Sequence, residues 1–485
     1  MDTKGAESRR KTQLSEGQDA EGRGGTLLIG KYLLPGDGTV RENWGVAFTK
    51  DESGSNGRPG SEILDTGPAE ELKKEFPGFK LIEEPQSIVS PGFVNSHMHM
   101  YGILSHGITP PVPIDGFETF LHKFWWPLVE NRIDHEMIRA TTTATALELI
   151  NSGVTTVFDI LEGPNSIPGA LQVQAEVLEM LGMRGFLSFE SCERMGKENG
   201  ELGLKENLDC FRRYKEHPRI SGIMSIHTTF TCPPAFIQKA AEYARSEGIK
   251  LHMHVNESSY EADWCKKHFD KLPFQLYRDL EFLGPDVIAS QCVKLSSEEM
   301  DLIAETGTNA VHVPLSNCEV GGGFSPVPDL LEKNVNVGLG TDGYINNFFE
   351  VMRGAFLMHK AHRENPEVMP AAPVYDMATV NGNALFYGKG ENGENNGKSM
   401  GNSGIGTLAP GYKADIITID ARFPTPVNSS NIFDQIILYR NPEHVTKVYI
   451  DGVLVKDQGL LLGHDVEEAY KETHKQAERL WAFGV

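Results

Sequence analysis

The sequence predicts an α/β protein built on a (β/α)8 barrel, and three observations support that fold class. After residue 87, strand-like apolar runs alternate with helix-like stretches eight times. The eight units span roughly 250 residues, which is the usual size of such a barrel. Several histidines and carboxylates stand where a strand-like run ends, and this fold builds its active sites at the carboxyl ends of its strands.

Each barrel unit can be placed on the sequence. The expected strands cover residues 88–96, 153–159, 184–191, 220–227, 250–256, 287–293, 308–315 and 336–342. Between strands, apolar residues recur at three- and four-residue spacing, which is the period of an amphipathic helix. The clearest expected helices cover residues 134–150, 233–246 and 296–306. We expect the barrel to occupy residues 87–403.

The flanking segments have a different pattern. Residues 25–86 and 404–460 contain short strand-like runs broken by turns, and residues 461–485 contain a helical stretch from Val466 to Trp481. Residues 1–24 are polar with few apolar side chains, so we expect disorder there. Residues 388–403 form a similarly polar insertion.

The strongest chemical signal is the pair His97 and His99, one residue apart at the end of an apolar run. Residues i and i+2 of a strand point to the same face, so both imidazoles would project together. His254 and Asp342 end two later strand-like runs. Three imidazoles and one carboxylate form a ligand set that suits zinc or iron. A lone His-x-His pair can equally be a buried hydrogen-bonding pair, so the metal hypothesis depends on all four residues.

A divalent metal would determine the chemistry. Bound zinc lowers the pKa of water to about 7, so hydroxide forms at neutral pH. Asp342 could then act as both ligand and base. Glu257, three residues beyond His254, could carry the proton onward to the reacting molecule. The alternative for Glu257 is a surface carboxylate in the first turn of the following helix.

Four motifs resemble the amidohydrolase superfamily, in the branch of cytosine, guanine and adenosine-type deaminases and chlorohydrolases. They are residues 91–99 (PGFVNSHMH), His254-x-x-Glu257, residues 312–317 (HVPLSN) and residues 338–343 (GLGTDG). The resemblance covers nearly the whole chain. Four further segments are most similar to SsnA-type aminohydrolases: residues 124–127 (FWWP), 189–191 (FES), 411–415 (GYKAD) and 424–426 (PTP).

This resemblance implies a fold, a reaction and a metal number. The two flanks would fold together as a small β-sandwich beside the barrel, and the chain would form a homodimer or higher homo-oligomer. The reaction would be attack by a metal-bound hydroxide on a C–N bond of a small nitrogen heterocycle, with removal of an amino group. Two-metal members carry a bridging lysine on the fourth strand, and residues 220–227 contain none. One divalent ion is therefore expected, zinc before iron.

The substrate-binding residues are harder to assign. Gln291 stands where the family pattern has a histidine; it could polarise the substrate, or mark a reaction that needs less acid assistance, or mark a loss of activity. His227 ends the fourth strand, and it is either a substrate contact or a buried structural histidine. Glu190 could recognise a ring N–H or amino group. Trp125 could stack on a heterocycle, or pack beneath its loop.

Two alternatives to an aminohydrolase remain open at this point. The chain could be a hydrolase that displaces chloride or an amide nitrogen, or a catalytically impaired barrel that binds metal or ligand. Composition sets outer limits. A net charge of −22 argues against a nucleic-acid polymer as partner, and the sequence has no uninterrupted apolar run of membrane-spanning length. Six cysteines without paired metal-finger spacing fit reduced thiols in the cytoplasm.

Overall fold

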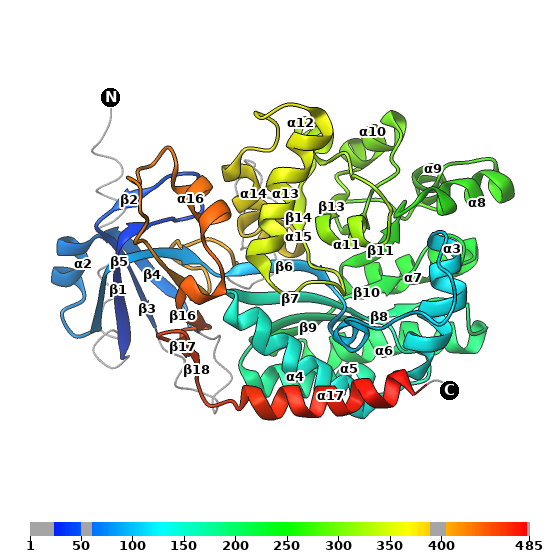
Figure 1. Cartoon of the computed structure of the whole chain (residues 1–485), viewed down its shortest axis with the longest axis horizontal. Helices are drawn as coiled ribbons and strands as arrows, with labels where there is room; N and C mark the ends of the chain where they lie inside the picture. Colours follow the sequence, from blue (N-terminus) through cyan, green and yellow to red (C-terminus); the bar gives the residue numbers. More distant parts are fainter. Residues whose placement is uncertain (1–23, 50–60, 389–403, 483–485) are drawn as a thin grey trace.

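The computed structural model describes residues 24–49, 61–388 and 404–482, which form two sheets with helices packed around them (Figure 1). The predicted disorder of residues 1–24 and the polar insertion at 388–403 fall almost entirely outside the described residues. The first sheet is the expected barrel, and the second is formed by segments from both ends of the chain. None of the described helices is long and apolar enough to cross a membrane.

The barrel strands are parallel and follow one another around the barrel in chain order. They are β6 (Phe93–Met98), β7 (Val154–Leu161), β8 (Arg184–Ser191), β9 (Ile220–Gly222), β10 (Met224–Ile226), β11 (Leu251–Val255), β12 (Val287–Gln291), β13 (Asn309–His312) and β14 (Val337–Leu339). Together β9 and β10 form the fourth strand, which is interrupted at Ile223. A bridge between Met98 and Asp342 links the end of the first strand to the residues that follow the last one. The predicted barrel is thus confirmed.

Helices cover the outside of the barrel. They are α4 (His135–Asn151), α5 (Ala170–Leu181), α6 (Lys197–Tyr214), α7 (Pro234–Glu247), α8 (Ser259–Phe269), α9 (Pro273–Asp279), α10 (Ser297–Thr306), α11 (Pro314–Glu319), α12 (Val327–Glu332), α13 (Phe348–Arg363), α14 (Ala371–Met377) and α15 (Val380–Tyr387). Their ends follow local sequence signals. Helix α10 begins at a capping box formed by Ser296 and Glu299 and ends at Gly307, whose φ is +69°.

The predicted first strand, residues 88–96, is in fact two strands. Residues up to Pro91 belong to β5 (Lys80–Pro91) of the second sheet, and β6 of the barrel begins at Phe93. Gly92 separates them, and a Cβ there would lie 2.3 Å from the side chain of Thr155, so only glycine fits. The last residues of β5 and all residues of β6 are buried, so the sequence shows one continuous apolar run across Gly92.

The second sheet joins the two ends of the chain, as expected. Its order is β18-β17-β16-β15-β5-β1-β3-β4, with β2 paired to β1. The bounds are β1 (Gly25–Leu33), β2 (Arg41–Glu42), β3 (Trp44–Thr49), β4 (Ile63–Pro68), β15 (Ile416–Asp420), β16 (Val445–Ile450), β17 (Val453–Asp457) and β18 (Leu460–Leu461). The antiparallel pair β5–β15 connects the N-terminal strands to the C-terminal strands. The short helices α2 (Ala69–Glu75) and α16 (Ile432–Tyr439) belong to the same two segments.

The C-terminal helix α17 (Val466–Trp481) has the predicted bounds and packs along α4 on the outside of the barrel (Figure 1). Thr473 donates a hydrogen bond to the carbonyl of Ala140 on α4, at 3.2 Å. At the far end, the Trp481 indole N–H donates to the carbonyl of Leu104, at 2.7 Å. Because Leu104 lies in the loop after β6, this helix also supports one wall of the site described below.

A buried ion network fastens the barrel to the second sheet. Arg184, which opens β8 and is 2% exposed, donates to both carboxylate oxygens of Asp415, at 2.8 and 3.1 Å. The Asp415 carboxylate also accepts the backbone N–H of Asp451, at 2.7 Å. Burial opposes the charge of Arg184, but the carboxylates of Asp415 and Asp451 outweigh it and raise the pKa of the guanidinium. The pair is satisfied on both sides, so its charges are stable in the interior.

Replacing Asp415 by alanine tests this junction. The change leaves Arg184 buried without its main partner, so we expect the free energy of unfolding to fall by about 3–5 kcal/mol. The control D301N breaks the exposed pair of Lys333 and Asp301 on the surface and should cost less than about 1 kcal/mol. Urea denaturation followed by circular dichroism measures both changes. Similar losses in the two variants would contradict the assigned role of the buried pair.

Candidate active site

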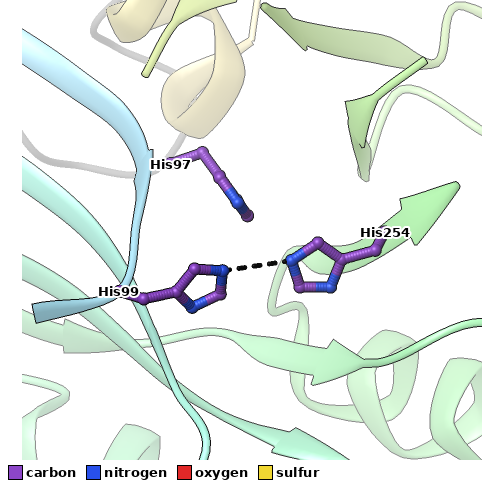
Figure 2. Close-up of side chains that lie close together, drawn as sticks. All are labelled: His97, His99 and His254. Atoms are coloured by element: carbon purple, nitrogen blue, oxygen red, sulfur yellow. Dashed lines mark hydrogen bonds between the residues drawn. The ribbon is translucent and has the colours of Figure 1, made fainter. Parts of the chain in front are cut away.

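Three histidines converge at the carboxyl end of the barrel (Figure 2). His97 and His99 come from the end of β6, and His254 comes from β11 on the other side of the barrel. The Nε2 atoms of His99 and His254 lie 3.3 Å apart. The Nε2 atom of His97 is buried without a hydrogen-bond partner. One ligand nitrogen from each residue lies close enough to the others for the three to hold a common ion.

The other ring nitrogen of each histidine has its own neighbour, and these contacts decide which nitrogen carries the proton. His99 Nδ1 lies 2.6 Å from the carbonyl of Ile160, which can only accept, so this nitrogen is the donor. Glu190 Oε2 lies 3.0 Å from His254 Nδ1 and favours a proton there. His97 Nδ1 lies 3.2 Å from His252 Nε2. His99 and His254 then present Nε2 lone pairs, and His97 does the same when its Nδ1–H donates to His252. Three lone pairs that face one point can hold a cation.

The electrostatics agree with this geometry. Burial lowers the pKa of the His99 imidazole, but the carboxylates of Glu162 and Asp342 outweigh burial and raise it to about 9. The surrounding carboxylates therefore favour positive charge at the point that Nε2 of His99 faces. Burial would also raise the pKa of Asp342, yet the neighbouring His99 and a hydrogen bond from Gln291 hold it below its usual range. Asp342 is accordingly an anionic carboxylate.

Barrel closure places Asp342 beside the histidines. Its backbone N–H donates to the carbonyl of His97, at 3.1 Å, and its φ of +58° turns the chain away from the strand direction. Its carboxylate oxygens lie 3.9 Å from His97 Nε2 and 3.5 Å from His99 Nε2. The four predicted ligands are therefore brought together, with Asp342 at a longer distance than the imidazoles.

Glu257 follows β11 after Asn256, whose φ is +51°. The side chain is half-buried and lines the same cavity as Asp342 and His254. Burial, reinforced by the Asp342 carboxylate, raises the pKa of Glu257 well above its ordinary value. A carboxyl group in that state can hold a proton near neutral pH and release it to a substrate.

The cavity has a volume of about 1280 Å³ and opens at the carboxyl end of the barrel. Of the predicted substrate contacts, His227, Gln291 and Trp125 line it. Trp125 lies in a π-helix (Phe120–Val129) between β6 and α4. It stacks on Phe120 with ring centres 5.3 Å apart, and it donates to the hydroxyl of Tyr101 at 3.3 Å. Its neighbour Trp126 is not in the cavity wall and packs against the guanidinium of Arg194.

Glu190, predicted to contact substrate, lies elsewhere. It does not line the cavity but stands behind His254, beside the Nδ1 atom of that ring. Its position indicates that it orients the His254 ring. The place of Glu190 along its strand, which is all that the sequence shows, does not reveal this contact. His252 also lies deeper in the barrel, as the sequence suggested. There it contacts His97 Nδ1 and, through its own Nδ1, the hydroxyl of Ser225 at 2.9 Å.

Two buried carboxylates in the cavity wall were not found by the sequence reasoning. Glu162 follows β7, receives a hydrogen bond from Tyr101, and lies 3.9 Å from His99 Nδ1. Glu130 receives a hydrogen bond from Arg194. Burial raises the pKa of Glu162 to about 7, and neighbouring carboxylates contribute. The position of Glu162 just past a strand end was a usable signal, whereas Glu130 begins a 3-10 helix (Glu130–Arg132) that is too short to give one.

Comparison with known proteins agrees with the geometry. The model of the amidohydrolase family matches residues 88–455. The chain is 30% identical to the 5'-deoxyadenosine deaminase of Methanosarcina mazei over 443 residues, which cover 90% of this chain and 96% of that protein. It is 29% identical to the 5-methylthioadenosine/S-adenosylhomocysteine deaminase of Syntrophobacter fumaroxidans over 437 residues, which cover 87% and 94% of the two chains.

Solved structures share the fold. An adenosine deaminase from Xanthomonas campestris with bound zinc has a TM-score of 0.79 at 22% identity, covering 94% of this chain and 98% of that one. An atrazine chlorohydrolase from Arthrobacter aurescens complexed with zinc has a TM-score of 0.77 at 19% identity, covering 93% and 100%. With the match to the family model over most of its length, the chain belongs to the amidohydrolase family and is a hydrolase of carbon–nitrogen bonds other than peptide bonds.

Proposed function

We propose that this protein is a zinc-dependent aminohydrolase that removes the amino group from a purine-type heterocycle, with a nucleoside as the substrate class. The observation that carries the proposal is the convergence of three imidazole lone pairs and the Asp342 carboxylate beside Glu257, on one cavity. The names of the relatives support the purine ring. A cytoplasmic location and a homo-oligomeric assembly belong to the same proposal.

His97, His99, His254 and Asp342 would hold one divalent ion. The buried, unpartnered Nε2 of His97 supports this assignment, because an unsatisfied buried acceptor needs a partner. When bound, the ion lowers the pKa of a water molecule and so supplies the nucleophile at neutral pH. Zinc is our choice, because imidazole with one carboxylate suits it and two neighbouring structures contain it.

The side chains of this protein move the protons. Asp342, an anion held by hydrogen bonds from Gln291 and the N–H of Gly343, accepts a proton from the reacting water. Glu257, with its raised pKa, gives its proton to a ring nitrogen, which makes the attacked carbon more electrophilic. The proton taken from water then passes from Asp342 to the amino group, which leaves as ammonia when the C–N bond breaks. The added hydroxyl becomes a carbonyl and returns its proton to Glu257. A protein that only bound a ligand would not need Glu257 at this place.

The wall of the cavity is strongly acidic. Eight lining residues are carboxylic acids, and Lys294 is the one lining residue with a lysine or arginine side chain within the described chain. The acids are Asp115, Glu118, Glu130, Glu162, Glu257, Asp263, Glu319 and Asp342. Raised pKa values reduce the charge of Glu130, Glu162 and Glu257. The exposed acids Asp115, Glu118, Asp263 and Glu319 still give the opening a negative field, which repels anions more than neutral or cationic ligands. The substrate is therefore a nucleoside or free base and not a nucleotide.

Metal binding tests the ligand assignment. His254 belongs to two groups that could hold an ion, one with His97 and His99 and one with Glu190 and His227. We expect H99A to weaken zinc binding at least 100-fold and H227A to leave it nearly unchanged. E190Q should weaken it about 10- to 100-fold, because it removes the partner of a ligand histidine. Competition with a chromophoric chelator measures all three. If H227A loses zinc and H99A retains it, the metal site is the second group, formed by Glu190, His227 and His254.

Turnover tests the proton carriers. We expect the zinc-loaded protein to release ammonia from at least one member of a panel of adenosine, 5'-deoxyadenosine, guanosine and the free bases. D342N should abolish this activity, and E257Q should lower kcat by about 100- to 10,000-fold, the usual range for loss of an acid–base group. D301N, on the surface of α10, is the control. Full activity of D342N would remove Asp342 from its role, and no turnover of any substrate with either Zn2+ or Fe2+ would refute the function.

The acidic cavity predicts discrimination against phosphate. We expect kcat/KM for adenosine 5'-monophosphate to be at least about tenfold below that for adenosine, because the doubly charged group enters a negative field. The difference should shrink as ionic strength rises, since salt screens charges at the cavity mouth. It should also shrink in the double variant D263N/E319Q. Equal kcat/KM values at low salt would contradict the electrostatic selection.

A further inference from the structure

Of the two polar atoms in the carboxamide of Gln291, Nε2 is hydrogen-bonded to another described residue and Oε1 is not. At the end of β12, its Nε2 donates to Asp342 Oδ2, at 2.7 Å. Its Oε1 is buried and accepts no hydrogen bond from any residue that the structure describes. The side chain is 1% exposed, yet the residue forms part of the cavity wall. A buried acceptor without a partner is uncommon in native proteins and calls for a ligand or water that donates to it.

The orientation of the amide follows from its neighbour. Oδ2 of Asp342 accepts the hydrogen bond from Gln291 Nε2, and a carboxylate oxygen offers only lone pairs to such a neighbour. Its Oδ1 already accepts the backbone N–H of Gly343, at 2.6 Å. If the amide of Gln291 were turned over, its oxygen would face Oδ2 of Asp342 and two acceptors would be in contact. The nitrogen therefore stays on Asp342, and the oxygen is the atom that Gln291 offers to a ligand.

The backbone at Gln291 has an unusual conformation. Gln291 has a φ of +72° and the following Cys292 a φ of +50°, so two successive residues other than glycine adopt the left-handed conformation. Asp342 does the same, at +58°. Such conformations cost energy and persist where the surrounding structure fixes them, which is typical of functional sites. The turn directs the Gln291 side chain toward Asp342 and the cavity.

We propose that Gln291 Oε1 accepts a hydrogen bond from the leaving amino group of the substrate, and that this contact selects amino over halide leaving groups. The proposal rests on the proposed function and deepens it. The two polar atoms of a carboxamide are about 2.3 Å apart, so Oε1 stands beside the carboxylate that takes the proton of the reacting water. The attacked carbon must lie in the same neighbourhood, and its leaving group comes within reach of Oε1.

The chemistry of the leaving group makes this contact selective. An exocyclic NH2 has two N–H donors, so it can satisfy Oε1 while it is still bound to the ring. Chloride has no hydrogen to donate, and it would leave Oε1 buried and unsatisfied. A site that hydrogen-bonds one group of its substrate rejects an analogue lacking that group, because its own polar atom is then unpaired. The preferred substrates are thus heterocycles with a primary or secondary amine on the attacked carbon.

A binding cycle tests the contact without relying on turnover. In the E257Q background, which slows the reaction, dissociation constants are measured for adenosine and for 6-methylpurine riboside, which has the same shape but no N–H at that position. We expect adenosine to bind at least about tenfold tighter, the range of one buried hydrogen bond. In E257Q/Q291M the two ligands should bind alike. Loss of the contact with Asp342 could also weaken the binding of every ligand. Such an effect changes both dissociation constants by the same factor and cancels in their ratio.

S290A is the matched control. Ser290 is the neighbour of Gln291 on β12, its hydroxyl donates to the backbone carbonyl of Met253, and it does not line the cavity. The preference for adenosine should persist in E257Q/S290A. If E257Q/Q291M does not fold, the contact is tested by changing the ligand instead of the protein. The dissociation constants of adenosine and of 6-chloropurine riboside, which lacks the N–H donors, are then compared in the E257Q protein.

The outcomes separate this proposal from the one on which it rests. If the unaltered protein releases no ammonia from any amino heterocycle, the proposed aminohydrolase function fails. If it does release ammonia but the preference for adenosine survives in E257Q/Q291M, Gln291 does not read the amino group and the further inference is overturned. Equal binding of the paired ligands to the E257Q protein overturns it as well. Loss of the preference in E257Q/Q291M alone supports it.

Discussion

The contact between the first and last strands of the barrel is the constraint on which the site depends. Gly340 lies so close to β6 that a Cβ would stand 2.6 Å from the carbonyl of His97, and at Gly338 it would meet the hydroxyl of Ser96 at the same distance. Without side chains at these positions, β14 can approach β6, and the N–H of Asp342 reaches the carbonyl of His97. The step that closes the barrel therefore also brings the carboxylate to the histidines.

Charge balance in the interior follows from that arrangement. The three imidazoles are surrounded by buried carboxylates, which include Asp342 in the cavity wall and Glu190 behind His254. Buried carboxylates are costly unless they are paired or hydrogen-bonded. Here they orient the rings and favour a cation at the point that the rings face. The same excess of carboxylates extends to the mouth of the cavity, so the groups that stabilise the centre also restrict which ligands can approach it.

Much of the architecture could be predicted because it depends on local periodicity. The bounds of α17 and the strand ends that carry His97, His99 and His254 follow from the spacing of apolar residues. The error at residues 88–96 has the same origin. The end of β5 and the whole of β6 are buried, so one continuous apolar run hides the change of sheet at Gly92. Glu130 begins a 3-10 helix of one turn, which is too short for a periodic signal, and its place in the cavity wall became visible only in three dimensions.

By itself, the sequence determined the fold class and the order of the barrel strands, and it placed the candidate ligand residues near strand ends, because side-chain direction alternates along a strand and active sites follow strand ends in this fold. Only the tertiary structure decided which atoms meet. It placed Glu190 behind His254 instead of in the cavity, and it turned the nitrogen of Gln291 toward Asp342. These choices depend on distances between strands far apart in the chain, and on which neighbour can donate and which can only accept.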